Sequence, residues 1–357
     1  MLGVFRFFLA SCVMVFHLTA MMPMLGVYAV NSFYVISGFL ITLILNKTYH
    51  FNFFNFSINI FLRLYPSYFI FLLMGFVIIY LFPSARLFHT FWSGDFLPGD
   101  YLGNLLIFPW AFLSDNAVAN PFAAFIKEYP FHVDGNRFRI VTSSWSVAVE
   151  LVCYFLLWFI IARKWYFSFV ALVLSIIYHV YVYYYIQSFQ IAYFSFIAAL
   201  LPFSIGSTSF FLSEKIKKSE PSFNFSTKTT LLFLCIIIFC TNWYLSEYIN
   251  PTGWIQPGYY INNVISSLIV MILIRCEYHG NFREIAKLIG DMAYPVFLCH
   301  YFCGYFSWLI IGTTHPTRGW GVFLLAYPIS ILLSILCVIL IDKKLSKMRD
   351  FIRRGVN

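Results

Sequence analysis

The sequence predicts an all-α integral membrane protein with about ten transmembrane helices and both termini in the cytoplasm. Of its 357 residues, 61% are hydrophobic and 10% are charged, against about 45–50% and about 25% in soluble domains. This composition excludes a soluble globular enzyme, a disordered chain and a disulfide scaffold. Apolar stretches of about 20 residues, long enough to cross the hydrocarbon core of a bilayer, recur along the chain.

Ten of these stretches are expected to span the membrane. The first carries Arg6 and His17 and has no convincing signal-peptide cleavage site, so we expect it to remain as a span. The second contains the small residues Ser37 and Gly38, which allow neighbouring helices to approach closely. The expected spans lie near residues 2–22, 27–45, 65–82, 144–162, 166–186, 191–212, 229–246, 259–275, 291–312 and 321–341.

The distribution of Lys and Arg sets the predicted orientation. Of the 23 basic residues, 18 fall on the side of the termini and five on the other side. These five are Arg86, Lys127, Arg137, Arg139 and Arg318. Because Lys and Arg gather in cytoplasmic loops, the termini are expected inside. The same bias accounts for the net charge of +9 without a nucleic-acid partner.

The chain is expected to form one transmembrane domain, residues 1–341, followed by a basic cytoplasmic tail, residues 342–357. One long loop, residues 83–143, is placed outside and is expected to fold against the membrane surface because it is rich in aromatic residues. The tail is expected to form an amphipathic helix on anionic membrane lipid. The eight Cys lie in or beside apolar runs without a zinc-binding pattern, so no metal is expected.

Two ionisable residues in the first span are candidates for function, because charged groups are costly inside a membrane. Arg6 and His17 are eleven residues apart, which places them on one helix face and about 16 Å apart along the axis. A cation near the cytoplasmic surface and a base deeper on the same helix face suit a long anionic molecule that enters from the cytoplasm. Alternatively, Arg6 extends to the interface and His17 forms a structural hydrogen bond.

The fourth span supplies a carboxylate at a similar depth. It opens with Trp145 and Ser146 and carries Glu150 about 9 Å inside the membrane. A carboxylate and an imidazole at one level can form a pair in which the carboxylate orients the base, so we expect Glu150 beside His17. The alternative for Glu150 is a structural ion pair with an arginine of the external loop.

Three further positions are candidates at the site. Arg63 enters the third span from the cytoplasmic side, where it could also serve only as a topology-determining charge. Tyr294 and His300 lie within the ninth span, and His300 could also be structural.

These residues resemble the motifs of the acyltransferase-3 family of bacterial membrane acyltransferases, in the family's order and across nearly the whole chain. They are Arg6-x10-His17, Tyr34-x-x-Ser37-Gly38-Phe39, Arg63-x-Tyr65-Pro66, Trp145-Ser146-x-x-x-Glu150 and Tyr294-Pro295-x-x-Leu298-x-His300. Three positions depart from the family pattern. Ile60 stands where a second Arg is frequent, Leu151 where an acidic residue is frequent, and Ala293 where the motif has Ser.

The resemblance implies a bacterial inner-membrane enzyme that moves an acyl group, usually acetyl, from cytoplasmic acyl-CoA to a surface-glycan hydroxyl. The expected acceptor is a lipopolysaccharide O-antigen sugar or a lipid-linked glycan. The resemblance implies that Arg6 and Arg63 bind the phosphates of acetyl-CoA. His17 would deprotonate the hydroxyl or carry the acyl group itself, and Glu150 would orient it. The expected site-shaping residues are Ser37, Trp145, Ser146, Tyr294 and His300.

Two other classes of protein also place ionisable residues inside spans. A secondary transporter of a small anionic or sugar-type solute would do so, but we find no inverted repeat with matching broken spans. A purely structural membrane partner is disfavoured by the alignment of Arg6, His17 and Glu150.

Overall fold

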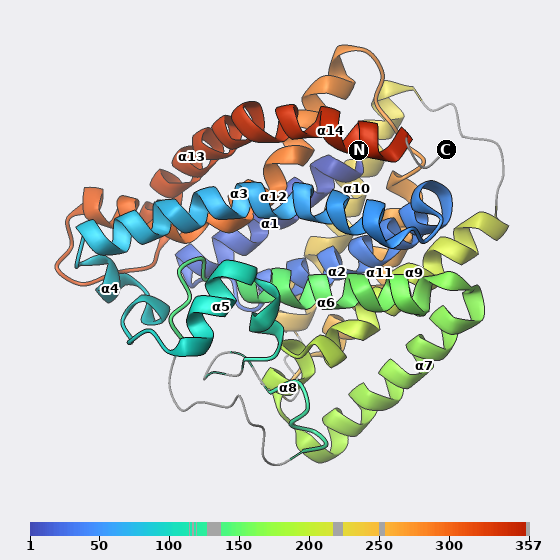
Figure 1. Cartoon of the computed structure of the whole chain (residues 1–357), viewed down its shortest axis with the longest axis horizontal. Helices are drawn as coiled ribbons and strands as arrows, with labels where there is room; N and C mark the ends of the chain where they lie inside the picture. Colours follow the sequence, from blue (N-terminus) through green and yellow to red (C-terminus); the bar gives the residue numbers. More distant parts are fainter. Residues whose placement is uncertain are drawn as a thin grey trace.

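The computed structural model describes residues 1–113, 115, 118, 120–126, 137–216, 224–249 and 254–354. Within these ranges the regular structure is helical and contains no strand. The helices form one bundle, with shorter helices gathered at one side (Figure 1). Three basic residues of the charge count, Lys127, Lys217 and Lys218, lie outside the described residues.

Eight of the described helical segments are long and apolar enough to cross a membrane. Their main helices are α1 (Leu2–Thr19), α2 (Leu25–Ile44), α3 (Phe53–Leu81), α7 (Trp165–Tyr181), α9 (Phe196–Lys215), α10 (Phe225–Tyr244), α12 (Asn281–Ile311) and α13 (Trp320–Cys337). Two shorter apolar helices, α6 (Ser144–Phe159) and α11 (Pro257–Leu273), occupy the other two predicted stretches. The prediction of an all-α, multi-pass membrane protein is confirmed, and the count of ten spans stays a prediction.

Several of these helices continue beyond their α-helical bounds. Single π-helical turns extend four of them, at η1 (Leu45–Tyr49), η5 (Val182–Ile186), η6 (Leu245–Ile249) and η7 (Val338–Asp342). A short 3-10 turn, η4 (Ile161–Arg163), follows α6, and α8 (Phe189–Tyr193) precedes α9.

Two helices begin about ten residues earlier than the hydropathy predicts. Helix α3 begins at Phe53 rather than near residue 65, because the Asn52 side chain caps it by accepting a 3.1 Å hydrogen bond from the Asn55 amide. Helix α12 begins at Asn281 rather than near residue 291 and opens with a polar stretch. Hydropathy identifies only the apolar part of a helix that can contact lipid. Both helices begin before that part, so their first residues lie outside the predicted spans.

Close contacts between helix backbones fix the centre of the bundle. Helix α2 packs against α1, α6, α9 and α11. A Cβ at Gly38 would collide with the carbonyl oxygen of Phe203, and a Cβ at Gly206 would collide with that of Val35, so α2 and α9 touch through two glycines. Helices α1 and α12 also approach closely, because a Cβ at Gly290 would lie 2.7 Å from the Cα of Gly3. The close approach predicted for the second span is confirmed at Gly38.

The described parts of the 83–143 loop fold over the end of the bundle that carries His17. They form α4 (Ala85–Phe88), the 3-10 turns η2 (Thr90–Trp92) and η3 (Phe108–Ala111), and α5 (Pro98–Leu106). The His89 ring lies 4.6 Å from that of Tyr301, and the Trp92 ring stacks 5.5 Å from that of Phe302. Ring contacts with α12 therefore hold the loop in place.

The tail forms helix α14 (Lys343–Arg354) at the opposite end of the bundle, near the start of α1 (Figure 1). It packs against α3. The side-chain Nδ2 of Asn59 donates to the backbone carbonyl of Arg349 at 3.5 Å, and Arg349 Nε donates to Asn59 Oδ1 at 3.4 Å. The tail is thus docked on the transmembrane domain at this point. Its predicted contact with lipid stays a prediction, as does the cytoplasmic location of both termini.

Candidate active site

The His17 imidazole forms the centre of a cluster between α1 and α12. Its Nδ1 shares a 2.7 Å hydrogen bond with the Tyr301 hydroxyl, and its ring stacks on His300 with centroids 5.3 Å apart. The His300 Nδ1 lies 2.8 Å from the Phe297 carbonyl, so this nitrogen carries the proton. The His300 Nε2 is buried and has no hydrogen-bond partner in the described part of the chain. The close packing of α1 on α12 brings these groups together.

The Glu150 carboxylate forms a second cluster between α6 and α2. It accepts hydrogen bonds from the Ser37 and Tyr154 hydroxyls. Tyr154 follows Glu150 by four residues, so both side chains share one face of α6. The expected direct pairing of Glu150 with His17 is wrong: the hydrogen bonds of Glu150 go to Ser37 and Tyr154, and His17 bonds to Tyr301 instead.

A small cavity of about 40 Å³ joins Arg6 and Glu150. Ser146 and Tyr294 line the same cavity. The Arg6 guanidinium lies 5.9 Å from the centre of the Phe33 ring, and its Nε is buried without a hydrogen-bond partner. A buried guanidinium N–H without a partner, on the same cavity as a carboxylate, is a prepared site for an anionic or carbonyl oxygen.

A larger cavity of about 230 Å³ lies on the loop side of the bundle. It is lined by His17, Tyr301 and Trp145 together with loop residues. Val30 and Phe297 line both cavities, so the two spaces adjoin through these side chains. The Arg6 end and the His17 end of α1 therefore border neighbouring spaces, which is the alignment that the eleven-residue spacing predicts.

Comparison with known proteins decides the family. The acyltransferase-3 model, an acyltransferase domain, matches residues 2–342. The chain belongs to the acyltransferase-3 family. No curated protein and no solved structure matches it. Because the match covers nearly all of the chain, the predicted family is confirmed, and the protein is a multi-pass membrane acyltransferase.

The candidate residues named from the sequence occupy three places in this acyltransferase-3 domain. His17, His300 and Trp145 lie at or beside the larger cavity, whereas Arg6, Glu150, Ser146 and Tyr294 line the smaller one. Ser37 donates a hydrogen bond to Glu150 at the smaller cavity. Arg63 lies farther out, close enough for its charge to repel that of Arg6. The catalytic and binding roles of these residues stay predictions.

Sequence reasoning missed Arg349 of helix α14, which lies near Arg63 of α3. Arg349 lies close enough for its charge to repel that of Arg63, and hydrogen bonds join it to Asn59, the residue before Ile60. Ile60 is the position where the acyltransferase-3 motif often has a second Arg. Helix α14 therefore carries a guanidinium to the neighbourhood where α3 lacks one. No local sequence signal reveals this contact, because 290 residues separate Asn59 from Arg349.

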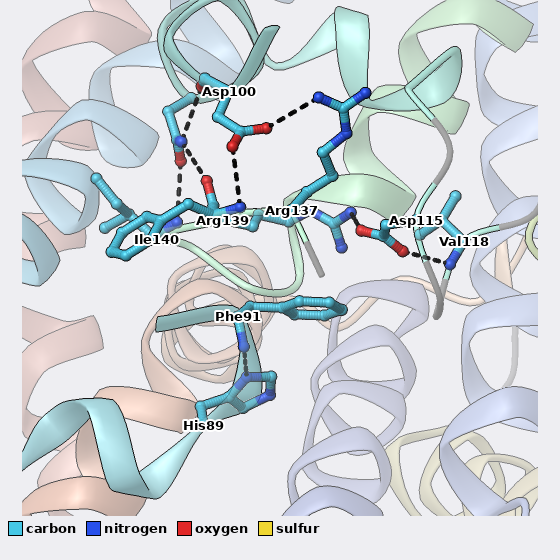
Figure 2. Close-up of polar contacts among 10 residues, drawn as sticks. His89, Phe91, Asp100, Asp115, Val118, Arg137, Arg139 and Ile140 are labelled. Carbon is cyan, nitrogen blue, oxygen red and sulfur yellow. Dashed lines mark hydrogen bonds and ion pairs between the residues drawn. The ribbon is translucent and has the colours of Figure 1, made fainter. Parts of the chain in front are cut away.

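Sequence reasoning also missed two polar groups of the loop, Arg139 and Asp115. The Arg139 Nη2 donates to Asp115 Oδ2 at 2.8 Å, and neither side chain is exposed to solvent (Figure 2). Burial lowers the pKa of the Arg139 guanidinium, and the Asp115 carboxylate opposes that shift. Arg139 lines the larger cavity with His17. The sequence signal for these residues is the pair of arginines, Arg137 and Arg139, that lies directly before the span that begins near residue 144.

Within the described ranges, no three His, Cys, Asp or Glu side chains gather closely enough to hold a metal ion. The polar groups of the two cavities are an imidazole, two guanidinium groups, a carboxylate and hydroxyls, which are suited to proton transfer and to binding oxygen atoms.

Proposed function

We propose that this membrane acyltransferase moves an acetyl group from acetyl-CoA to a sugar hydroxyl of a surface glycan, such as the lipopolysaccharide O-antigen, in the bacterial inner membrane. The observation that carries the proposal is the pair of adjoining cavities. One is lined by Arg6, whose Nε has no hydrogen-bond partner among the described residues, and the other is lined by His17. Two substrates that approach from opposite sides can meet between them.

Positive charge marks the proposed donor entrance. Acetyl-CoA is polyanionic, and guanidinium groups bind phosphates through paired hydrogen bonds. Arg63 and Arg349 lie together at the end of the bundle where α1 begins, with Arg6 deeper on α1. The phosphates would bind at this end, and the pantetheine arm would run past Val30 and Phe297 towards His17.

The proposed chemistry uses the free Nε2 of His17. When Nδ1–H donates to the Tyr301 hydroxyl, Nε2 can accept a proton. Nε2 removes the proton from the sugar hydroxyl while its oxygen attacks the thioester carbonyl carbon. The carbon–sulfur bond then breaks, and the protonated imidazole returns the proton to the thiolate of CoA. In the alternative route, Nε2 attacks the thioester carbonyl carbon and the thiolate of CoA leaves. The sugar hydroxyl then attacks the acetyl carbon, the bond from Nε2 to that carbon breaks, and the hydroxyl proton passes to the thiolate.

Glu150 acts at a distance in this scheme. Its carboxylate faces the cavity that contains Arg6 and is fixed by Ser37 and Tyr154. A fixed negative charge there holds the Arg6 guanidinium at the proposed path of the donor. We therefore assign Glu150 a positioning role through Arg6, in place of the direct orientation of His17 that the sequence suggested.

The deciding experiment is mass analysis of surface polysaccharide from cells with the protein, without it, and with the His17→Ala variant at matched expression. We expect O-acetyl groups only with the unmodified protein. Polysaccharide that is identical in all three strains would reject a glycan acceptor. Loss of solute uptake without any change in glycan acetylation would favour the transporter class.

A further inference from the structure

Two polar side chains at the wall of the larger cavity are buried without hydrogen-bond partners. The Nε and Nη1 atoms of Arg139 and the Oγ1 atom of Thr142 have no hydrogen-bond partner among the described residues, although both residues are almost completely buried. Both side chains line the cavity that contains His17. They belong to the short segment that leads from the loop into α6.

Arg139 is too firmly held for its free N–H groups to result from mobility. Its Nη2 is bonded to Asp115, as Figure 2 shows. Its guanidinium also lies between two rings, 4.7 Å from the centre of Phe91 and 4.8 Å from the centre of Trp110. Cation–π contacts and an ion pair thus fix the plane of the guanidinium. The free donors are held in one orientation.

Buried donors without partners are rare, because each loses its hydrogen bonds to water without replacement. Here the two residues that carry three such atoms line the same cavity as the proposed catalytic imidazole. A ligand whose oxygen atoms reach Arg139 and Thr142 would satisfy them. Because the donors are already oriented, little ordering is needed when it binds.

The cavity favours a small, uncharged, hydroxyl-rich ring. Its volume of about 230 Å³ is below the ~300–1,000 Å³ of sites for drug-sized ligands, so it fits one sugar unit rather than a chain. Trp145 and Tyr193 supply flat apolar faces. The Asp115 carboxylate already compensates the charge of Arg139, so an acidic sugar would add an unbalanced negative charge.

We propose that Arg139 and Thr142 bind the hydroxyl and ring oxygens of one uncharged sugar unit, and so select the acceptor and present it to His17. This inference rests on the proposed function for its catalytic consequence, but sugar binding can be measured without any acyl transfer. Arg139 donates through Nε and Nη1, while Asp115 keeps Nη2 occupied. The Thr142 hydroxyl either donates to the sugar or accepts from it.

The test uses conservative variants, because removal of the guanidinium would leave Asp115 buried without its cation. Arg139→Lys keeps the positive charge and loses the fork of donors, and Thr142→Val keeps the shape and loses the hydroxyl. Arg137→Lys is the matched control. Arg137 is another buried loop arginine, paired with Asp100 at 3.5 Å (Figure 2), and it does not line the cavity. Ser204→Ala controls for loss of a buried hydroxyl without a partner elsewhere in the bundle.

Two measurements are made on the full chain in lipid vesicles. The first is binding of neutral methyl hexopyranosides and of the matching uronic acids, followed by tryptophan fluorescence. The second is the half-saturating concentration of acceptor and of acetyl-CoA during transfer. Arg139→Lys should weaken binding of the neutral sugar by about 10- to 150-fold, and Thr142→Val by about 2- to 12-fold. The half-saturating concentration of acetyl-CoA should not change, and both controls should bind like the unmodified protein.

Two results would overturn the inference. One is sugar binding that is unchanged in Arg139→Lys and Thr142→Val, and the other is the absence of sugar binding to the unmodified protein. Uronic acids that bind more tightly than neutral hexoses would overturn the assigned sugar class. If the unmodified protein binds neutral sugars through these residues but transfers no acetyl group, the proposed function fails and the binding site stands.

Discussion

Replacement of Tyr301 by Phe tests whether the hydrogen bond to His17 takes part in the chemistry. The bond is 2.7 Å long, and Tyr301 is only 7% exposed, so water cannot readily replace the lost hydroxyl. A neutral hydrogen bond contributes about 1 kcal/mol and one to a charged group about 1.5–3 kcal/mol. His17 is neutral before the reaction and cationic during proton transfer.

The difference between those two states sets the size of the effect. Loss of the bond should raise the barrier by about 0.5–2 kcal/mol more than it raises the ground state, which lowers kcat by about 2- to 30-fold. His17→Ala removes the base itself and should cost about 10²- to 10⁴-fold. Half-saturating concentrations of donor and acceptor should change little in Tyr301→Phe, because its hydroxyl bonds to His17.

The assay is initial-rate transfer from acetyl-CoA to glycan in vesicles at matched protein levels. Tyr305→Phe is the control, because Tyr305 is a buried tyrosine one turn along α12 whose hydroxyl bonds to Ser84 at 2.7 Å, away from both cavities. A Tyr301→Phe rate within twofold of the unmodified protein, with His17→Ala inactive, would refute the role of this bond. Inactivity as complete as that of His17→Ala would make Tyr301 itself a catalytic group.

The remaining predictions concern the donor side and the loop. Glu150→Gln should slow transfer by about 10- to 150-fold, because the fixed charge beside Arg6 is lost; initial rates check this, and an unchanged rate would exclude a role for that charge. Arg6→Ala and Arg349→Ala should each raise the half-saturating concentration of acetyl-CoA by about 10- to 150-fold, with partial recovery in Arg6→Lys. Titration of acetyl-CoA with each variant measures this, and half-saturating concentrations equal to that of the unmodified protein would place the phosphates elsewhere. His89 should make the fold sensitive to acid, because burial and then the charges of Arg318 and Arg139 lower its pKa from 6.5 to about 3. The folded state binds fewer protons than the unfolded state between these values, so the thermal midpoint should fall as the pH drops from 6.5 towards 3, and less steeply in His89→Gln.

The candidate site was only partly predictable from the sequence. The i,i+11 spacing on one helix placed Arg6 and His17 along a common line, because helical periodicity is local. The predicted pairing of Glu150 with His17 rests only on the similar depth of the two side chains in the membrane. Depth does not fix rotation about the helix axis, and the rotation of α6 turns Glu150 towards Ser37 and Arg6 instead.

The missed residues share one physical cause. Tyr301, Arg139 and Arg349 all act through partners far away in the sequence, at His17, in the cavity and at Asn59. Such contacts depend on which helices pack together and how closely. Glycine contacts set that packing here, and the glycines themselves are visible in the sequence, whereas their partners across the interface are not.

The sequence by itself determined that the chain is an all-α membrane protein of the acyltransferase-3 family, and it located the helices that carry Arg6, His17 and Glu150. These properties follow from composition, from runs of apolar residues and from motifs, which are local along the chain. The tertiary structure alone decided the partner of each functional side chain and the separation of the site into two adjoining cavities. It also brought α14 to Arg63 and the loop to His17, because contacts between distant segments depend on side-chain packing in three dimensions rather than on any repeat along the sequence.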